Sequence, residues 1–139
     1  CWEQYASGNA LVHTARGLAS ANPESASLLL SLGDGTIDGI QGPNITKAAL
    51  IGCDVALQSY RELGKWLGEG MGNLVALLDP DIFVLGGGVA EAGMALVDPV
   101  IESLNSHLTA KAFRKAPQVR IAKLGNQAGM VGASALARG

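Results

Sequence analysis

The chain has 139 residues, of which 48% are hydrophobic, 16% charged and 4% aromatic, and its formal net charge is -2. This composition is typical of one packed domain and excludes a disordered segment. Because there is no basic run and no apolar stretch near the ~20 residues that span a bilayer, we expect neither a nucleic-acid partner nor a membrane partner. Two cysteines, Cys1 and Cys53, are too few for a secreted disulfide framework, which indicates a cytoplasmic protein.

Two helices are predicted near the start of the chain. In the first, which begins near residue 8, Leu11, Ala15 and Leu18 recur at helical spacing. A second, short helix covers 23–32. The following segment, 33–44, is rich in Gly, Asp, Asn and Pro, which predicts an exposed connection.

The most strongly patterned element is a helix over 54–78. A short helix is expected just before it, with Thr46 as its N-cap because a hydroxyl can accept from a free backbone N–H of the first turn. Arg61 and Glu62 lie on the polar side of the long helix, and Asp79-Pro80 ends it. Its apolar side repeats at helical spacing through Leu57, Tyr60, Leu63, Leu67, Met71, Leu74, Val75 and Leu78.

Three glycines, Gly64, Gly68 and Gly72, recur every four residues inside this helix. Each should cost about 1 kcal/mol relative to alanine, so the row is expected only where something approaches the helix closely. Either a neighbouring element packs there or the row forms a wall that faces a nucleotide.

After the long helix, the apolar residues no longer recur at helical spacing. Residues 82–85 form a continuous apolar run, which predicts a strand buried on both faces, and Gly86-Gly87-Gly88 turns the chain. Asp98 is expected to cap a helix whose first residue is Pro99. A second strand over 119–122 and a C-terminal helix complete a parallel α/β unit. Two strands make a thin sheet, so we expect the chain to be part of a larger fold.

The glycine turn after the first strand is the clearest functional feature. Glycines let backbone N–H groups approach a phosphate or a ribose, and the start of a following helix favours negative charge. The fingerprint of a nicotinamide-binding domain is incomplete, because its third glycine position is occupied by Glu91. A phosphate-binding P-loop is excluded because no Gly-Lys-Ser/Thr follows. Nucleotide contact and a simple tight turn both remain open at this point.

The other candidate site residues are at the start of the chain. Glu3 could accept from sugar hydroxyls, although an isolated glutamate is commonly a solvated surface residue. Cys1 is either one ligand of an incomplete metal cluster or an ordinary thiol, since a zinc site of this kind needs four ligands. His13 and His107 have no metal-ligating neighbours at suitable spacing, and we expect both to be structural or solvent-facing.

Three segments carry a resemblance to a known family. CWEQYASGNAL resembles the end of the C-x-C-G-x-x-G-C-x-E motif of bacterial ROK-family sugar kinases, DIFVLGGGVAEAG resembles their C-terminal nucleotide-binding turn, and LGNQAGMVGASALA resembles their last helix. The resemblance implies an α/β fold, helix-rich with a partial parallel sheet, that is the C-terminal lobe of a ribonuclease-H-like (actin-like ATPase) fold. Residues 1–139 would then be a partial C-terminal lobe, with the N-terminal lobe and the upstream zinc-motif residues absent.

The family motif assigns roles to five residues. Glu3 would bind the sugar, Gly86, Gly87 and Gly88 would bind the nucleotide, and Cys1 would be the last ligand of a structural zinc ion. The general-base aspartate is expected upstream of residue 1, so no catalytic residue is assigned, and zinc is expected to be lost from this piece. The GDGT sequence at 33–36 is expected to be a surface turn rather than a phosphate loop.

The resemblance implies an enzyme, a kinase that transfers a phosphoryl group from ATP with Mg²⁺ to the 6-hydroxyl of glucose. Polyphosphate is an alternative donor, and the parent protein is expected to be a homo-oligomer. This piece alone is expected to be inactive. Alternatives are the sugar-sensing lobe of a ROK transcriptional repressor, a ROK kinase for N-acetylmannosamine, allose or fructose, and a nicotinamide-binding domain.

Overall fold

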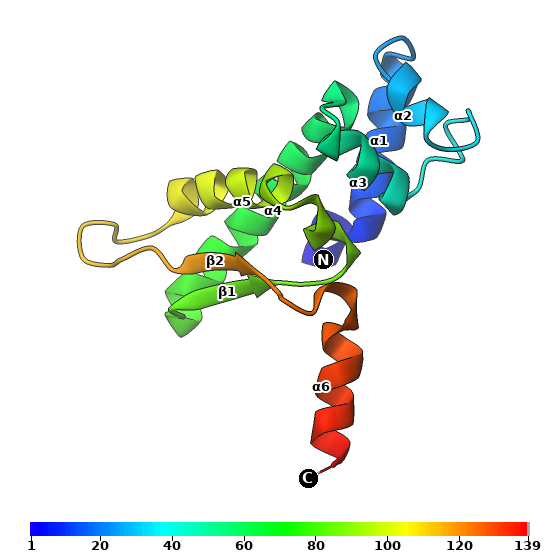
Figure 1. The fold of residues 1–139 in the computed structure, drawn as a ribbon. Helices are drawn as coiled ribbons and strands as arrows, with labels where there is room; N and C mark the ends of the chain where they lie inside the picture. The colour runs from blue at the N-terminus through cyan, green and yellow to red at the C-terminus, as the bar shows by residue number, and fades with distance from the viewer. Residues whose placement is uncertain (139) are drawn as a thin grey trace.

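The computed structural model describes residues 1–138 as a set of helices with a small two-stranded sheet (Figure 1). The helix pair α4 and α5 supports the sheet, and α1, α2 and α3 gather around the N-terminal half of α4. In chain order the elements are η1 (Trp2–Gln4), α1 (Gly8–Ala21), α2 (Ser27–Ser31), α3 (Gly42–Leu50), α4 (Asp54–Leu78), β1 (Ile82–Leu85), η2 (Gly88–Ala92), α5 (Met94–His107), β2 (Gln118–Ile121), η3 (Gly125–Gln127) and α6 (Ala128–Ala137).

The long helix α4 has the predicted bounds, and its glycine row is a packing surface for α5. A Cβ at Gly64 would lie 2.8 Å from the Pro99 Cβ, and one at Gly68 would lie 2.5 Å from the Leu104 backbone nitrogen. Gly72 faces the last turn of α5 in the same way. Close packing is therefore confirmed, and the alternative of a nucleotide-facing wall is wrong, because α5 itself occupies that side of α4.

The predicted start of α5 is wrong. The helix begins at Met94, after Gly93 with a φ of 61°, so Asp98 is not its N-cap and Pro99 lies inside it. Proline is disfavoured in a helix interior because it lacks an N–H and its ring crowds the preceding turn. Here the ring packs into the space left open by Gly64, and that contact between helices outweighs the local signal for a helix start.

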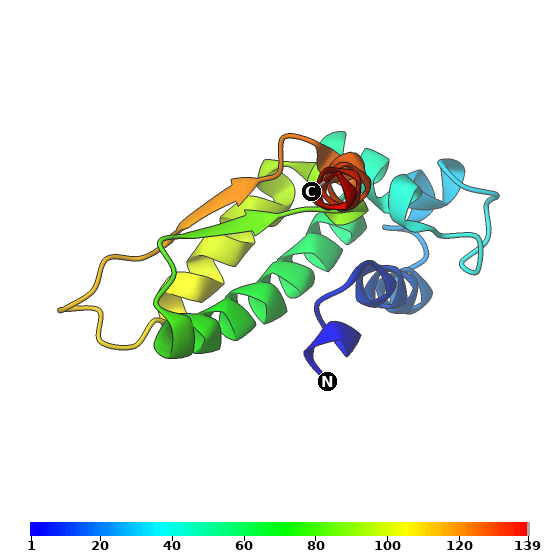
Figure 2. The same ribbon diagram turned by 90° about the horizontal axis from the view of Figure 1, so that it is seen from below.

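The sheet consists of β1 and β2, paired in parallel with Ile82 opposite Gln118 and Leu85 opposite Ile121. The crossover between the strands contains α5, which confirms the predicted parallel α/β unit. The prediction that the first strand is buried on both faces is wrong, since Val84 is 61% exposed. Among the described residues only one face of the sheet is covered, by the α4–α5 layer seen in Figure 2, so Phe83 and Leu85 pack on the core and their neighbours face outward.

The helix α3 begins earlier than predicted, and Thr46 is not its cap. Gln41 precedes the first turn, and its backbone N–H donates to the Asn44 side chain at 3.1 Å. Thr46 lies in the second turn, where its hydroxyl donates to the Gly42 carbonyl at 3.1 Å and contacts the Tyr60 hydroxyl at 2.9 Å. A hydroxyl inside a helix can bond the carbonyl four residues back, which is the competing use that the cap prediction overlooked.

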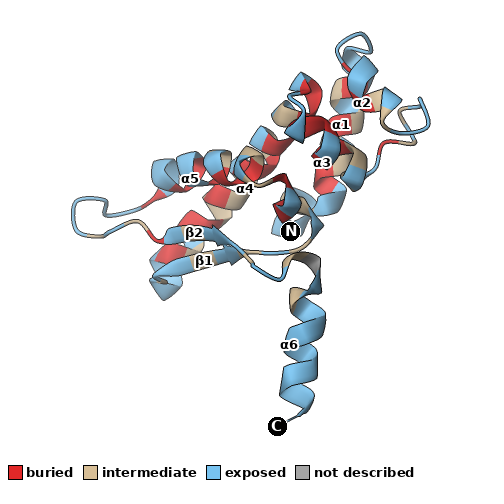
Figure 3. Ribbon diagram, viewed as in Figure 1, coloured by how far each residue is buried: buried red, intermediate tan, exposed pale blue. Residues whose placement is uncertain are grey.

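The buried residues form one cluster where α1, α3, α4 and α5 meet (Figure 3). Leu11 and Ala15 belong to it, as their spacing predicted, and Cys53 is buried at the head of α4. In contrast, α6 projects from the end of the sheet and is exposed along its length, with Leu136 at 85%. Within residues 1–138, no helix combines the length and the apolar character needed to cross a membrane.

Candidate functional site

The glycine turn lies at the carboxyl end of β1, which is the edge where parallel α/β sheets bind ligands. Gly87 has a φ of 80°, a backbone conformation that side chains other than glycine rarely adopt. A Cβ at Gly87 or Gly88 would have no neighbour within 4 Å, and one at Gly86 would touch only the Ala122 Cβ at 3.8 Å. The turn therefore exposes its backbone to open space, as a ligand cradle requires.

Two helices begin beside this turn. The first turns of α1 and α3 enter one hollow of about 600 Å³ with the glycines, so two sets of free backbone N–H groups meet there. Helix N-termini favour negative charge and bind phosphate. The hollow is lined by Ala6, Ser7, Gly8, Asn9, Leu11, Val12, Gly42, Pro43, Thr46, Gly86, Gly87, Gly88, Val89 and Glu91.

A second hollow, of about 470 Å³, is lined by Cys1, Glu3 and the start of α1. Ser7 and Asn9 line both hollows, so the first turn of α1 is their common wall. His13 also lines the second hollow, and its exposure agrees with the prediction that it faces solvent. The structure thus brings Glu3 close to the space in front of the glycine turn, although more than eighty residues separate them in the sequence.

The segment that carries Glu3 is anchored by the residue before it. The Trp2 indole N–H donates to the Trp66 carbonyl at 2.8 Å, and the ring of Tyr5 lies 4.8 Å from that of Trp66. Gly70 makes room for the Trp2 ring, because a Cβ there would overlap it. Trp2 and Tyr5 therefore hold η1 against α4, while the Glu3 side chain remains exposed.

Residues 1–138 offer a single ligand, Cys1, for the predicted zinc ion, and one ligand does not make a zinc site. Cys1 is exposed, and among residues 1–138 no three His, Cys, Asp or Glu side chains come together as metal ligands. Tetrahedral zinc sites use four ligands, and these residues offer one. Cys1 as a zinc ligand remains a prediction, and nothing below depends on a metal at that position.

Tyr60 lies behind the first hollow, the one at the glycine turn, and its hydrogen bond with Thr46 connects α4 to α3. Burial raises the pKa of the Tyr60 hydroxyl, the hydrogen bond with Thr46 lowers it, and the negative charge of Glu91 raises it. The Thr46 hydroxyl in turn bonds the Gly42 carbonyl in the first turn of α3. This buried pair fixes the wall of the hollow that the α3 N-terminus provides.

The GDGT sequence forms a surface turn between α2 and α3, as predicted. The Thr36 hydroxyl and backbone N–H both donate to one Asp34 carboxylate oxygen, at 2.8 and 2.9 Å. These bonds lower the pKa of the Asp34 carboxyl group. The aspartate is therefore used within its own turn, and this segment lines neither of the two hollows.

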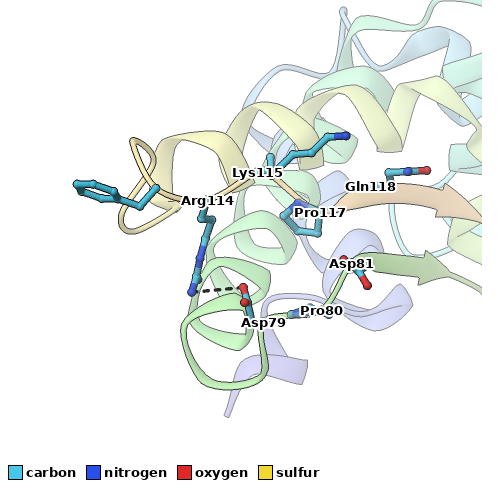
Figure 4. A pocket seen from close by; sticks show the side chains of 9 residues that line it. Asp79, Pro80, Asp81, Arg114, Lys115, Pro117 and Gln118 are labelled. Atoms are coloured by element: carbon cyan, nitrogen blue, oxygen red, sulfur yellow. Dashed lines mark ion pairs between the residues drawn. The ribbon is translucent and has the colours of Figure 1, made fainter.

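A third hollow, of about 490 Å³, lies at the amino ends of the strands and is lined by residues 79–81 and 113–118 (Figure 4). Arg114 spans it, donating to the Val75 carbonyl at 2.9 Å and lying 3.3 Å from Asp79. A cation at the C-terminus of a helix stabilises its free carbonyls. Since ligands of parallel sheets bind at the opposite edge, we assign this hollow a structural role in ending α4.

The sequence predicts Glu3 and the glycines as site residues, but its local patterns do not indicate the wall shared by the two hollows or the place of the α3 N-terminus. Ser7 could have been found, because a serine before Gly8 and the apolar repeat is an N-cap signal, and its hydroxyl accepts from the Ala10 N–H at 3.2 Å. Gly42 and Pro43 also mark a helix start. Their place beside Gly87 depends on how α3 packs on α1 and α4, which no local pattern encodes.

Comparison with known proteins places this chain in a family. The model of the ROK family matches residues 1–139. The chain belongs to the ROK family. The alternative of a nicotinamide-binding domain is therefore wrong.

The relatives of this ROK chain include several sugar kinases. The glucokinase of Streptomyces coelicolor is 51% identical over 138 residues, which are 99% of this chain and 44% of the relative. The N-acetyl-D-glucosamine kinase of Erwinia tasmaniensis is 40% identical over 79 residues, which are 57% of this chain and 24% of the relative. The chain thus spans less than half the length of the curated relatives it matches.

The fold agrees with that of a solved ROK protein. A ROK family glucokinase from Streptomyces griseus, solved in complex with glucose and AMPPNP, superposes with a TM-score of 0.95 at 49% identity, over 99% of this chain and 44% of that chain. The predicted fold class, helix-rich with a small parallel sheet from an actin-like ATPase fold, is therefore confirmed.

Proposed function

We propose that residues 1–139 are a partial C-terminal lobe of an ATP-dependent glucokinase, which transfers the γ-phosphoryl group of ATP to the 6-hydroxyl of glucose. The observation that carries this proposal is the wall shared by the two hollows. Ser7 and Asn9 line both the hollow of Glu3, a carboxylate suited to sugar hydroxyls, and the hollow of the glycine turn and the two helix N-termini. A sugar held at Glu3 and a nucleotide held at the glycine turn would therefore both contact the first turn of α1.

In this proposal the chain contributes binding and alignment. Glu3 accepts hydrogen bonds from sugar hydroxyls and orients the ring, with two oxygens that can each accept from a different O–H. Gly86, Gly87 and Gly88 present their backbone to the nucleotide, and the N-termini of α1 and α3 stabilise phosphate charge. Mg²⁺ bound with ATP would neutralise phosphate charge, and no residue among 1–138 is proposed as its ligand.

Proton removal from the sugar hydroxyl is not assigned to these residues, since no aspartate lines either hollow. Positioning and charge stabilisation are therefore the roles proposed for these residues, and both contribute strongly to phosphoryl transfer. We further propose that the whole protein is cytoplasmic and assembles as a homo-oligomer, and that Cys1 is one of its zinc ligands.

The test is a product assay on the full-length protein that contains this chain. Glucose 6-phosphate should form with ATP, and glucose should be phosphorylated with a higher kcat/KM than N-acetylglucosamine, N-acetylmannosamine, allose or fructose. A higher kcat/KM for one of the other sugars would assign a different ROK kinase. Specific DNA binding with no turnover of any sugar would instead identify a ROK repressor.

A further inference from the structure

The hollow of about 600 Å³ in front of Gly86, Gly87 and Gly88, called the glycine hollow below, has an unusual charge pattern for a phosphate-binding site. Of its lining residues, Glu91 is the one with a charged side chain, and no Lys, Arg or His lines it. Attraction for phosphate there comes from backbone N–H groups, those of the glycine turn and those at the N-termini of α1 and α3. Near the turn, Leu11, Val12 and Val89 provide an apolar wall. Such a site fits a ligand with an apolar ring and hydroxyl groups as well as phosphates better than it fits a bare polyanion.

The backbone of η2 directs Glu91 away from the core. Its two neighbours, Ala90 and Ala92, are each only 2% exposed, and the Ala90 N–H donates to the Gly87 carbonyl at 3.1 Å. Because both neighbours are buried, the intervening side chain projects outward, on the side of the glycine turn. Among residues 1–138, Glu91 forms no salt bridge.

A second observation places the carboxylate on the α3 side of the hollow. The short helix η2, which carries Glu91, packs against α3, and Glu91 lines the hollow together with Gly42 and Thr46. In agreement with this placement, the pKa of the Tyr60 hydroxyl is raised by burial, the larger cause, and also by the negative charge of Glu91. That hydroxyl is 2.9 Å from the Thr46 hydroxyl, which lines the hollow. Glu91 therefore lies between the glycine turn and the α3 N-terminus, with its oxygens available to a ligand.

We propose that Glu91 selects the phosphoryl donor by accepting hydrogen bonds from the ribose hydroxyls of a nucleotide. The inference rests on the proposed function and adds the class of donor and the residue that reads it. The two oxygens of one carboxylate can accept from the two neighbouring hydroxyls of a ribose, and such charge-assisted bonds are strong. The same negative charge repels inorganic polyphosphate, which has no hydroxyl groups to offer in return.

The experiment measures nucleotide binding by calorimetry on the full-length protein, with Glu91→Ala as the variant. Glu91 is exposed, and the substitution only extends Ala90 and Ala92 to three consecutive alanines, so the protein should still fold. We expect the wild-type protein to bind ADP roughly tenfold to a hundredfold more tightly than 2′-deoxy-ADP or 3′-deoxy-ADP. Glu91→Ala should bind all three nucleotides with about the same, weaker affinity. Glu24→Gln, an exposed carboxylate between α1 and α2, is the matched control and should behave like wild type.

Three results would overturn the inference. One is unchanged ribose discrimination in Glu91→Ala. Another is a changed Mg²⁺ dependence with unchanged discrimination, which would make Glu91 a metal ligand. The third is displacement of ADP from the wild-type protein by inorganic tripolyphosphate at an equal concentration. Turnover of glucose with ATP is measured on the same preparations, and its absence overturns the proposed function, whereas the binding data test Glu91 separately.

Discussion

Two helix glycines, Gly68 in α4 and Gly17 in α1, should respond in opposite ways to substitution by alanine. In Gly68→Ala, the new Cβ would lie 2.5 Å from both the Leu104 nitrogen and the Ser103 Cβ, and 2.6 Å from the Val100 carbonyl oxygen. These atoms belong to or adjoin the backbone of α5, so they cannot move aside as the end of a flexible side chain would. Helix propensity favours alanine by about 1 kcal/mol, and overpacking of a tight contact costs about 3 kcal/mol when the backbone must shift.

Gly68→Ala should therefore lower the free energy of unfolding by about 2 kcal/mol. Gly17 is the matched control, since it lies inside α1 and a Cβ there would meet nothing within 4 Å. Gly17→Ala should raise stability by about 0.5–1 kcal/mol. The measurement is urea denaturation of the full-length protein, followed by circular dichroism. If both substitutions stabilise the protein equally, α5 does not pack against Gly68, and the account of the α4–α5 layer is wrong.

Three further predictions follow from other contacts. Tyr60→Phe should lower the free energy of unfolding by about 1 kcal/mol, because it removes the hydrogen bond with Thr46. Since the pKa of Tyr60 is raised in the folded state, wild-type stability should also decline as pH rises above the usual tyrosine value of 10.0. Denaturation measured across this pH range should show a smaller decline in the variant. Arg114→Ala should lower stability by about 1 kcal/mol in thermal denaturation and leave the KM values for both substrates unchanged, whereas a raised KM would show that its hollow binds a ligand. The isolated 139-residue chain should form no glucose phosphate in a coupled assay, because no aspartate lines either hollow, and any turnover would refute the division of roles proposed above.

Local signals predicted the long helix well and failed where packing overrides them. The bounds of α4 follow from the apolar repeat and from Pro80, both of which act within a few residues. Pro99 misled because its usual place is the first turn of a helix, and the room for it in the second turn comes from Gly64, which is distant in the sequence. Val84 misled because an apolar run does not say how many faces of a sheet are covered.

The candidate site shows the same division. Glu3 and the glycine turn could be recognised from short motifs, because their chemistry depends on residue type and local backbone. The shared wall at Ser7 and the contribution of Gly42 could not, since these come from the packing of α1 and α3 around the end of β1. In the sequence, Glu91 is only a departure from the nicotinamide fingerprint, because its place between the glycine turn and α3 comes from the fold.

The most direct test of the central claim is the kcat/KM for glucose of the full-length protein and of its Glu3→Gln variant, with ATP as donor. If the hollow at Glu3 holds the sugar and the glycine hollow holds the nucleotide, the wild-type protein forms glucose 6-phosphate. The variant should then lose roughly tenfold to a hundredfold in kcat/KM for glucose, with the KM for ATP unchanged. Failure of the wild-type protein to form glucose 6-phosphate, or an unchanged kcat/KM in the variant, would contradict the account.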